Sequence, residues 1–339
     1  MNTTDLAARA QSLVAPGKGI LAADESSSTI EKRFKSIKVD SSVENRRTYR
    51  ELLLTTAGAE EFISGVILYD ETIRQATKEG RPFTEVLNQL GIQPGIKVDA
   101  GAMDLAGHPG EKITEGLDGL RGRLAEYVKL GARFTKWRAV ITIGPGIPSE
   151  FCIEANAHAL ARYAALSQEA GLVPIVEPEV LMDGDHTLER CETVTEHTLS
   201  RVYAALHAHH VQLEGTLLKP NMVLSGKSCP RQAGAEEVAK ATVRCLKRTV
   251  PPAVPGIVFL SGGQTDEAAT LHLSAMNAFG PHPWQLSFSY GRALQAPALK
   301  VWGGQPANFV AAQKAYYHRA RMNGAARSGR YSTELERTT

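Results

Sequence analysis

Apolar and polar residues alternate along this chain on two scales. Short runs rich in Val, Ile, Leu and Phe recur about every 30 to 45 residues, and longer stretches with helical spacing of apolar positions lie between them. This pattern predicts alternating strands and helices. The expected strands are eight runs, at 19–23, 62–68, 96–98, 133–137, 172–176, 212–218, 257–260 and 285–288.

Two of the expected helices, at 152–170 and 236–250, are especially clear. Gly171 ends the first and Pro251-Pro252 ends the second, each ahead of the next strand. Eight parallel strands can close into a barrel filled by side chains, so we predict an α/β fold, a single-domain (β/α)8 TIM barrel. An open doubly wound sheet is the competing architecture, but no G-x-G-x-x-G motif follows the first strand and six strands would leave two runs unexplained.

We expect the barrel domain, including an N-terminal helical segment, to span residues 1–323. Residues 324–339 have little apolar content and are predicted to form a polar, mobile C-terminal tail, which could still close over a site.

Composition narrows the class of ligand. The 339-residue chain has a net charge of +2, from 38 Lys and Arg and 36 Asp and Glu, and neither sign forms a long block. This argues against a nucleic-acid or membrane surface and favours a small ligand. The four cysteines have no C-x-x-C spacing, and neither a secretory leader nor a run of about 18 apolar residues is present, so we expect free thiols and a cytoplasmic protein.

Lys219 ends the apolar run 213–218 and is followed by Pro220. Two interpretations are open. The ammonium can extend into water beyond a buried stem, or desolvation disfavours its charge and lets the neutral amine add to a carbonyl as a Schiff base. Taken alone, the residue favours the first.

Charged and hydroxyl side chains also end the other runs. The carboxyl ends of barrel strands face one mouth, where barrel enzymes carry their sites, so these side chains are expected to converge. Both signs of charge are present, which favours a functional site over a group of charges that are there only because water solvates them. The set is Asp24, Asp70, Lys97, Asp99, Lys136, Arg138, Glu177, Glu179, Lys219, Ser261 and Ser289.

Glycine-rich loops follow the last two runs. Glycines expose backbone N–H groups, and together with an arginine they often hold a phosphate at this place in a barrel. Lys97 and Lys136 indicate a second anionic group, so the expected ligand is a small molecule with two phosphates. The loops are Ser261-Gly262-Gly263-Gln264 and Ser289-Tyr290-Gly291-Arg292.

The same end of the barrel would also carry the groups that transfer protons. Clustered lysines depress one another's pKa, which together with desolvation would make Lys219 nucleophilic. Asp24 and Glu177 would supply the base and the acid.

A zinc ion that polarises a carbonyl is the rival mechanism. The histidine cluster His207, His209 and His210 lacks the i, i+4 pair of a helical zinc site. We predict that it is an exposed helix end and that no residue is a metal ligand.

Seven stretches carry a family resemblance: 17–26 (GKGILAADES), 95–99 (GIKVD), 136–138 (KWR), 173–179 (VPIVEPE), 213–223 (LEGTLLKPNMV), 259–264 (FLSGGQ) and 287–295 (SFSYGRALQ). With them the sequence closely resembles class I fructose-1,6-bisphosphate aldolases over nearly its whole length. The resemblance implies reversible cleavage of fructose 1,6-bisphosphate to dihydroxyacetone phosphate and glyceraldehyde 3-phosphate, in glycolysis and gluconeogenesis. It also implies that no cofactor or metal is used and that the protein is a homo-oligomer, a tetramer.

The resemblance implies roles as well. Lys219 looks like the Schiff-base lysine and Glu177 like the acid/base that handles dehydration of the carbinolamine. Asp24 looks like the aspartate of carbon–carbon cleavage at the 4-hydroxyl, and Lys136 like the lysine that assists Schiff-base formation.

Substrate contacts follow by the same matching. The 1-phosphate would be bound by Ser261, Gly262, Gly291 and Arg292, and the 6-phosphate by Ser26, Thr29 and Lys97. Arg33 and Arg138 are nearby candidates, and the predicted substrate-binding set is completed by Glu179, Gly263 and Ser289.

The sequence departs from the animal enzymes in two places. Ser26-Ser27-Ser28-Thr29 stands where they have Ser-Thr-Gly-Ser, so Ser28 replaces a glycine. The sequence closes with two threonines where they end in a tyrosine that serves proton exchange, so carbon–carbon cleavage is expected to be retained, with proton exchange either slower or served by another group.

Two alternative functions are less consistent with the sequence. Another lysine Schiff-base barrel enzyme, of the transaldolase or deoxyribose-phosphate aldolase kind, is disfavoured by two phosphate sites. A binding protein that keeps the fold without activity is disfavoured by the catalytic side chains, all present apart from the tyrosine.

Overall fold

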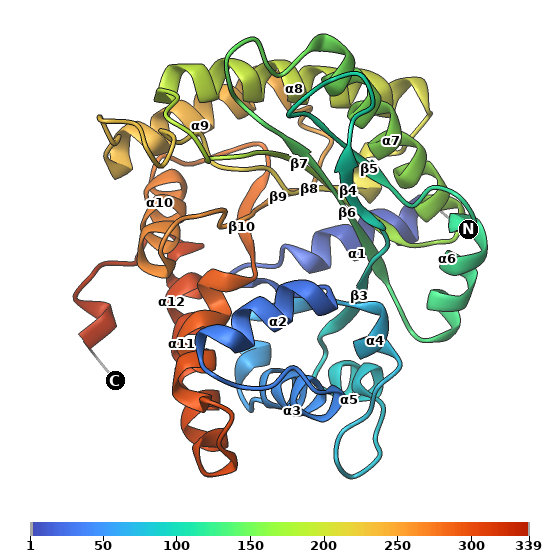
Figure 1. Cartoon of the computed structure of the whole chain (residues 1–339), viewed down its shortest axis with the longest axis vertical. Coiled ribbons are helices and arrows are strands. Elements are labelled where there is room, and N and C mark those ends of the chain that lie inside the picture. Colours follow the sequence, from blue (N-terminus) through green and yellow to red (C-terminus); the bar gives the residue numbers. More distant parts are fainter. Residues whose placement is uncertain (1–2, 338–339) are drawn as a thin grey trace.

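The computed structural model describes residues 3–337. Eight strands in this range close into a barrel in the order β1–β10–β9–β8–β7–β6–β3–β2, and each pairs with parallel neighbours (Figure 1). This confirms the predicted (β/α)8 barrel. The strands are β1 (Gly19–Ala23), β2 (Ile63–Leu68), β3 (Gln93–Lys97), β6 (Phe134–Ile141), β7 (Val173–Val180), β8 (Leu217–Leu218), β9 (Gly256–Phe259) and β10 (Gln285–Tyr290).

The apolar runs locate these strands more accurately than they give their lengths. β6 and β7 continue to Ile141 and Val180, beyond the predicted ends, because the two strands pair in register from Phe134 and Val173 onward. β8 is much shorter than predicted, since the 3-10 turn η2 (Leu213–Gly215) occupies the first part of its run. Lys136 and Glu177 therefore lie within β6 and β7 rather than at their ends, whereas Lys219 directly follows β8.

Helices surround the barrel (Figure 1). The two clearest predictions are confirmed to within two residues by α7 and α9. Within residues 3–337, none of the helices has both the length and the apolar character needed to cross a membrane. The α-helices are α1 (Thr3–Leu13), α2 (Ser27–Ser36), α3 (Val43–Leu54), α4 (Asp70–Ile73), α5 (Phe83–Gln89), α6 (Leu120–Lys129), α7 (Glu150–Glu169), α8 (Leu188–Ala208), α9 (Ala235–Thr249), α10 (Asp266–Ala278), α11 (Arg292–Trp302) and α12 (Phe309–Ala326), and the other 3-10 turns are η1 (Ala59–Glu61), η3 (Pro306–Asn308) and η4 (Leu335–Arg337).

A small hairpin outside the barrel was not predicted. Strands β4 (Gly101–Asp104) and β5 (Lys112–Glu115) pair antiparallel between β3 and α6. Their residues are mostly exposed or half-buried, so they lack the apolar run by which the barrel strands could be found. The first residues of β4 reach the mouth of the barrel, as described below.

The amino-terminal end of the barrel is closed by α1. Leu13 and Val14 are buried there with the barrel-interior residues, and glycines in β2 and β9 make room for them. A Cβ added to Gly65 would lie 2.8 Å from a Leu13 methyl, and one added to Gly256 would lie 2.6 Å from a Val14 methyl. Close approach, rather than an unusual backbone angle, therefore requires glycine at these positions.

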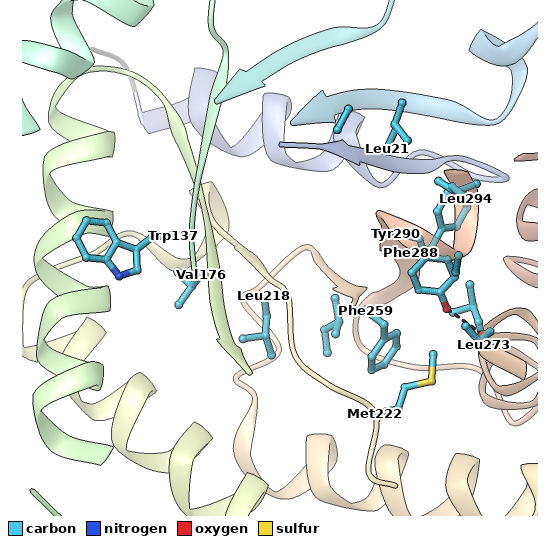
Figure 2. Packing of buried hydrophobic residues seen from close by; sticks show 14 of the residues in the cluster. Leu21, Trp137, Val176, Leu218, Met222, Phe259, Leu273, Phe288, Tyr290 and Leu294 are labelled. Atoms are coloured by element: carbon cyan, nitrogen blue, oxygen red, sulfur yellow. Dashed lines mark hydrogen bonds between the residues drawn. The ribbon is translucent and has the colours of Figure 1, made fainter. Parts of the chain in front are cut away.

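The main apolar core lies between the barrel and the surrounding helices. Figure 2 shows Val176, Leu218 and Phe259 in this layer, on three successive strands, with Trp137 toward α7. Tyr290 also belongs to it, and its hydroxyl donates to the carbonyl of Ala269 at 2.9 Å. The outward faces of the strands are thus apolar, and their inward faces supply the site.

Residues after 323, predicted to form a mobile tail, begin within α12, which ends at Ala326. The buried guanidinium of Arg327 then donates to the carbonyl of Lys18 at 3.0 Å. Tyr331 is 6% exposed, and its hydroxyl donates to Glu336 at 2.8 Å. These tail residues are packed against the rest of the chain, while the division at residue 323 itself stays a prediction.

Candidate active site

On three neighbouring strands the inward-facing positions change from apolar to charged toward the carboxyl end. Side chains along a strand alternate between its two faces, so residues two apart point to the same side. The barrel interior is apolar up to this level, and the next inward side chain on each strand is ionisable. Phe134 is followed on its face by Lys136, Ile175 by Glu177 and Leu217 by Lys219.

These side chains line a cavity of about 740 Å³ at the carboxyl ends of the strands. It is large enough for a sugar bisphosphate and far more polar than an ordinary apolar pocket. The predicted convergence of strand-end residues is therefore found in the structure. Its polar lining comprises Asp24, Glu25, Ser26, Ser28, Thr29, Arg33, Tyr69, Lys97, Asp99, Lys136, Arg138, Glu177, Glu179, Lys219, Ser261 and Ser289.

Lys219 is held at the inner wall of this cavity. Its backbone N–H donates to the carbonyl of Val176 at 2.8 Å, which extends the β7–β8 pairing by one residue. Its side chain is only 4% exposed, and its Nζ lies 3.3 Å from Oε1 of Glu177. The ammonium therefore does not extend into bulk water, which contradicts the interpretation that Lys219 alone favoured.

A row of alternating charges runs through the site. Asp24 Oδ2 lies 2.6 Å from Lys136 Nζ, which lies 3.2 Å from Glu177 Oε2, and the other oxygen of Glu177 faces Lys219. All four side chains are at most 13% exposed. Buried charges are tolerated when each has an opposite neighbour, and in this row every charge has one.

The charges fix the ionisation of the row. Burial alone would raise the pKa of Asp24 and of Glu177, but the nearby Lys136 and Lys219 outweigh it and hold both pKa values below the ordinary range. Burial would lower the pKa of Lys136, but Asp24 and Glu177 raise it well above that of a free lysine. The expectation that the clustered lysines depress one another's pKa is thus wrong for Lys136, because the carboxylates of Asp24 and Glu177 lie 2.6 and 3.2 Å from its Nζ and favour the charged form.

Ser289 offers a hydroxyl without a partner. It ends β10, is 1% exposed and lines the cavity, and its Oγ has no hydrogen-bond partner within residues 3–337. Buried polar atoms in folded proteins are almost always hydrogen-bonded. This position is therefore suited to a hydroxyl or phosphate oxygen of a ligand.

Lys97 and Arg138 lie on the side of the cavity next to the β4–β5 hairpin, and each has a carboxylate partner. Lys97 Nζ donates to the carboxylate of Asp99 and, at 2.9 Å, to its carbonyl. Arg138 Nε donates to Glu179 at 2.5 Å. Both cations line the cavity with their partners, so they can be shared with an anionic ligand.

The start of α2 forms another wall. Ser26 is the N-cap residue, and its Oγ lies 3.2 Å from that of Ser28 and 3.1 Å from Oγ1 of Thr29. All three hydroxyls are at the cavity, and a helix N-terminus favours an anion. Ser28 is accommodated within the first turn of α2, where a helical residue needs no glycine.

Arg33 lines the cavity but is already paired. Its guanidinium donates to the carboxylate of Glu25, which also accepts from Arg50 at 2.7 Å and from Gln295 at 2.8 Å. Burial would raise the pKa of Glu25, but Arg50 and Arg33 hold it below the ordinary range. This buried network was not predicted, because Arg50 and Gln295 are 25 and 270 residues away from Glu25 in the sequence and no periodic pattern connects them.

Only some residues of the two glycine-rich loops line the cavity. Ser261, Gly262 and Gly291 line the cavity, as predicted. Gly263 and Arg292 lie just outside this lining: the N–H of Gly263 points to the sulfur of Met182 at 3.0 Å, and Arg292 donates to the carbonyl of Gly262 at 2.5 Å. Both residues therefore lie beside the cavity lining, in contact with the loop that follows β9 or the residues next to it.

Asp70 and the histidine cluster lie outside the cavity lining. Asp70 does not join the set, since it begins α4 and accepts from Arg74 and from the hydroxyl of Tyr127, both at 2.9 Å. His207 and His209 lie at the end of α8, the predicted helix end. No cluster of three or more potential metal ligands occurs among the residues that the structure describes.

Tyr69 and the first residues of the hairpin, Ala100 to Ala102, also line the cavity and were not predicted. Tyr69 precedes the short helix α4, and the hairpin has no apolar run, so no periodic signal indicates either segment. Their place could be found only by knowing which loops the barrel brings together.

Comparisons with known proteins agree with this geometry. The family model for class I fructose-bisphosphate aldolases matches residues 5–339. A protein of Xanthomonas axonopodis pv. citri named a probable fructose-bisphosphate aldolase class 1 is 62% identical over 332 residues, which cover 98% of this chain and 99% of that protein. A fructose-bisphosphate aldolase of Dictyostelium discoideum is 56% identical over 333 residues, covering 97% and 93% of the two chains.

A solved structure is also closely similar. The fructose-bisphosphate aldolase of Plasmodium falciparum, crystallised in complex with TRAP and a small-molecule inhibitor, superposes with a TM-score of 0.96 and is 51% identical. The match covers 97% of this chain and 95% of that one.

Proposed function

The chain belongs to the family of class I fructose-bisphosphate aldolases, which cleave fructose 1,6-bisphosphate reversibly to dihydroxyacetone phosphate and glyceraldehyde 3-phosphate, and we propose that Lys219 is its Schiff-base lysine. The observation that carries this assignment is the buried row Asp24–Lys136–Glu177–Lys219 at the inner wall of the cavity. Within it Lys219 has a carboxylate at 3.3 Å that can take its proton.

Schiff-base formation uses the proton held between Lys219 and Glu177. Transfer from the ammonium to Glu177 frees an amine, whose lone pair attacks the ketone carbon, and a proton then passes from this nitrogen to the former carbonyl oxygen to give the carbinolamine. The carbinolamine hydroxyl then leaves as water with the proton from Glu177, and a protonated imine remains on Lys219. The low pKa of Glu177 means that it begins as a carboxylate and serves first as base and then as acid.

Carbon–carbon cleavage requires a base at the 4-hydroxyl, and Asp24 fits this role. Its pKa is held low by Lys136, so it is ionised before substrate binds. When it takes the hydroxyl proton, the bond between the third and fourth carbons breaks, and its electron pair flows toward the protonated imine. Lys136 remains an ammonium and stabilises the carboxylates on either side of it.

Two phosphate subsites are proposed along the cavity wall. Ser261, Gly262, Gly291 and Ser289 would receive the 1-phosphate end, with Gly263 and Arg292 shaping their loops. The 6-phosphate would lie against the wall that carries Lys97 and the hydroxyls at the start of α2, with Arg33, Arg138 and Glu179 beside it. Support comes from the cavity lining and the family resemblance.

Fructose 1-phosphate, which lacks the 6-phosphate, tests this division. Lys97→Met should raise KM for fructose 1,6-bisphosphate by about tenfold, since a hydrogen bond to a charged group is lost, and leave KM for fructose 1-phosphate unchanged. Ser261→Ala should raise both KM values. Equal effects of Lys97→Met on the two substrates would overturn the assignment.

The assembly and location are proposed from the family resemblance alone. We infer a cytoplasmic homotetramer, which light scattering should show as about four times the chain mass of 36.6 kDa. A fluorescent fusion that sediments with membranes, or a monomeric mass, would contradict these assignments.

A further inference from the structure

The loops that follow β7 and β8 are joined to each other above the barrel. The N–H of Gly226 donates to the carbonyl of His186, that of Lys227 to Met182 and that of Ser228 to Gly184, each at 2.8 Å. We call residues 182–186 and 226–228 the β7–β8 loop pair. These hydrogen bonds give the backbone of Lys227 a fixed position next to the loop that follows β9.

The β7–β8 loop pair contacts that neighbouring loop at Gly263. The sulfur of Met182 accepts the N–H of Gly263 at 3.0 Å. A Cβ added to Gly263 would lie 2.1 Å from Cε of Lys227 and 2.7 Å from its Nζ. The end of the Lys227 side chain thus occupies the space where any other residue at 263 would place its own, directly beside Gly262 of the cavity wall.

The N–H of Gly263 and the ammonium of Lys227 are each held only weakly by their present partners, Met182 and Asp183. A thioether sulfur is a weak acceptor, so the N–H of Gly263 keeps most of its capacity for an anion. Lys227 Nζ is 2.8 Å from Asp183, but the two side chains are 44% and 64% exposed. A pair this exposed contributes little, and a phosphate dianion is a stronger partner for an ammonium than a solvated carboxylate.

We propose that Lys227 is a further phosphate-binding residue, whose ammonium moves from Asp183 to the phosphate held at Ser261–Gly263. The inference rests on the proposed assignment of this loop to the 1-phosphate. On the other side of the loop, Arg292 holds the carbonyl of Gly262. The phosphate would then lie between the Gly262 loop, which Arg292 holds, and the ammonium of Lys227, which can move while its backbone stays in place.

Three variants test the charge separately from the shape. Lys227→Met keeps an apolar side chain on Gly263 and removes the ammonium, Lys227→Arg keeps a cation, and Lys240→Met removes an exposed lysine paired with Glu236 on α9 as a control. The measurements are kcat and KM for fructose 1,6-bisphosphate and fructose 1-phosphate, the calorimetric Kd for dihydroxyacetone phosphate, and the thermal midpoint.

Lys227→Met is expected to raise both KM values and the Kd by the same factor, about five- to tenfold, with kcat within about twofold and the thermal midpoint unchanged. Lys227→Arg should recover most of the loss, and Lys240→Met should match the wild type. Wild-type KM values in Lys227→Met, an effect on fructose 1,6-bisphosphate alone, or an equal loss in both Lys227 variants would overturn the inference. If the wild type failed to cleave either sugar, the proposed function would fail, and the calorimetric comparison would still decide the role of Lys227.

Discussion

Glu177 and Lys219 approach to 3.3 Å between carboxylate oxygen and ammonium, although their side chains are only 5% and 4% exposed and come from different strands. Neighbouring parallel strands place them together, since Val176 pairs with Leu218 and the next residue of each strand faces inward. A buried pair of this kind is weak evidence for stability, because desolvation offsets much of the attraction. We propose instead that the pair serves to move one proton between an amine and a carboxylate.

Glu177→Gln should therefore impair chemistry more than binding. Glutamine keeps the shape of the side chain but cannot take the proton of Lys219, so kcat is expected to fall by about 10² to 10⁴. Steady-state kinetics with fructose 1,6-bisphosphate measure this. Glu192→Gln, which removes a buried carboxylate paired with Arg244 between α8 and α9, outside the cavity lining, is the control and should leave kcat unchanged. A kcat for Glu177→Gln within twofold of the wild type would exclude Glu177 from proton transfer.

Lys136→Met tests the electrostatic role of the central lysine. Removing it leaves Asp24 and Glu177 buried with less positive charge, so the free energy of unfolding at pH 7 should fall by about 3 to 5 kcal/mol. In the wild type both carboxyl pKa values are depressed, so their contribution is present at neutral pH and is lost as pH falls through the folded pKa values.

In Lys136→Met burial dominates and both carboxyl pKa values rise, so the folded variant takes up protons first as pH falls. The difference in unfolding free energy between the two proteins should thus shrink from pH 7 to pH 5, as measured by urea denaturation at each pH. A difference that stays constant over this range would show that Lys136 acts through packing alone.

His272 gives a second pH dependence, independent of the cavity row. Burial lowers the pKa of this histidine in α10 to about 4, and its ring nitrogen lies 2.6 Å from Gln264 of the β9 loop. The unfolded chain binds a proton near pH 6.5 and the folded chain does not, so stability is full above pH 6.5 and is lost as pH falls toward 4. The wild type should lose about 2 kcal/mol more than His272→Gln between pH 7 and pH 5. Parallel stability curves for the two proteins would contradict this.

Gly256→Ala tests the packing of the barrel against α1. The added methyl would meet Val14 at 2.6 Å, and overpacking of this kind costs about 1 to 3 kcal/mol. Gly122→Ala is the matched control, because apart from its chain neighbours and the adjacent backbone of α6 no atom lies within 4 Å of its added Cβ, and alanine favours the helix by about 0.5 to 1 kcal/mol. Thermal midpoints that move in the same direction for both variants would contradict the packing argument.

The four proposed catalytic residues could be predicted from sequence because their placement follows a local rule. A strand has a period of two, so Lys136, Glu177 and Lys219 share the inward face of the barrel with the apolar residue two positions before each of them. Asp24 follows β1 in the same way. The resemblance to known aldolases then gave these positions their individual roles.

The remaining contacts depend on distances that no local pattern encodes. Arg33 is engaged by Glu25, and Arg292 by the carbonyl of Gly262, rather than pointing freely at the cavity. Asp70 starts a helix instead of extending the mouth, and Tyr331 is buried against α10 and α12 although its surroundings in the sequence are polar. Such pairings are set by which loops and helices the closed barrel brings together.

Chemical trapping of the imine tests whether Lys219 forms the Schiff base. The protein is incubated with dihydroxyacetone phosphate, the imine is reduced with borohydride, and the modified peptide is identified by mass spectrometry. We predict one adduct, on Lys219, and none in Lys219→Met, whose apolar side chain of similar length should leave the thermal midpoint near that of the wild type. An adduct on Lys136 or another lysine, or undiminished cleavage by Lys219→Met, would contradict the account.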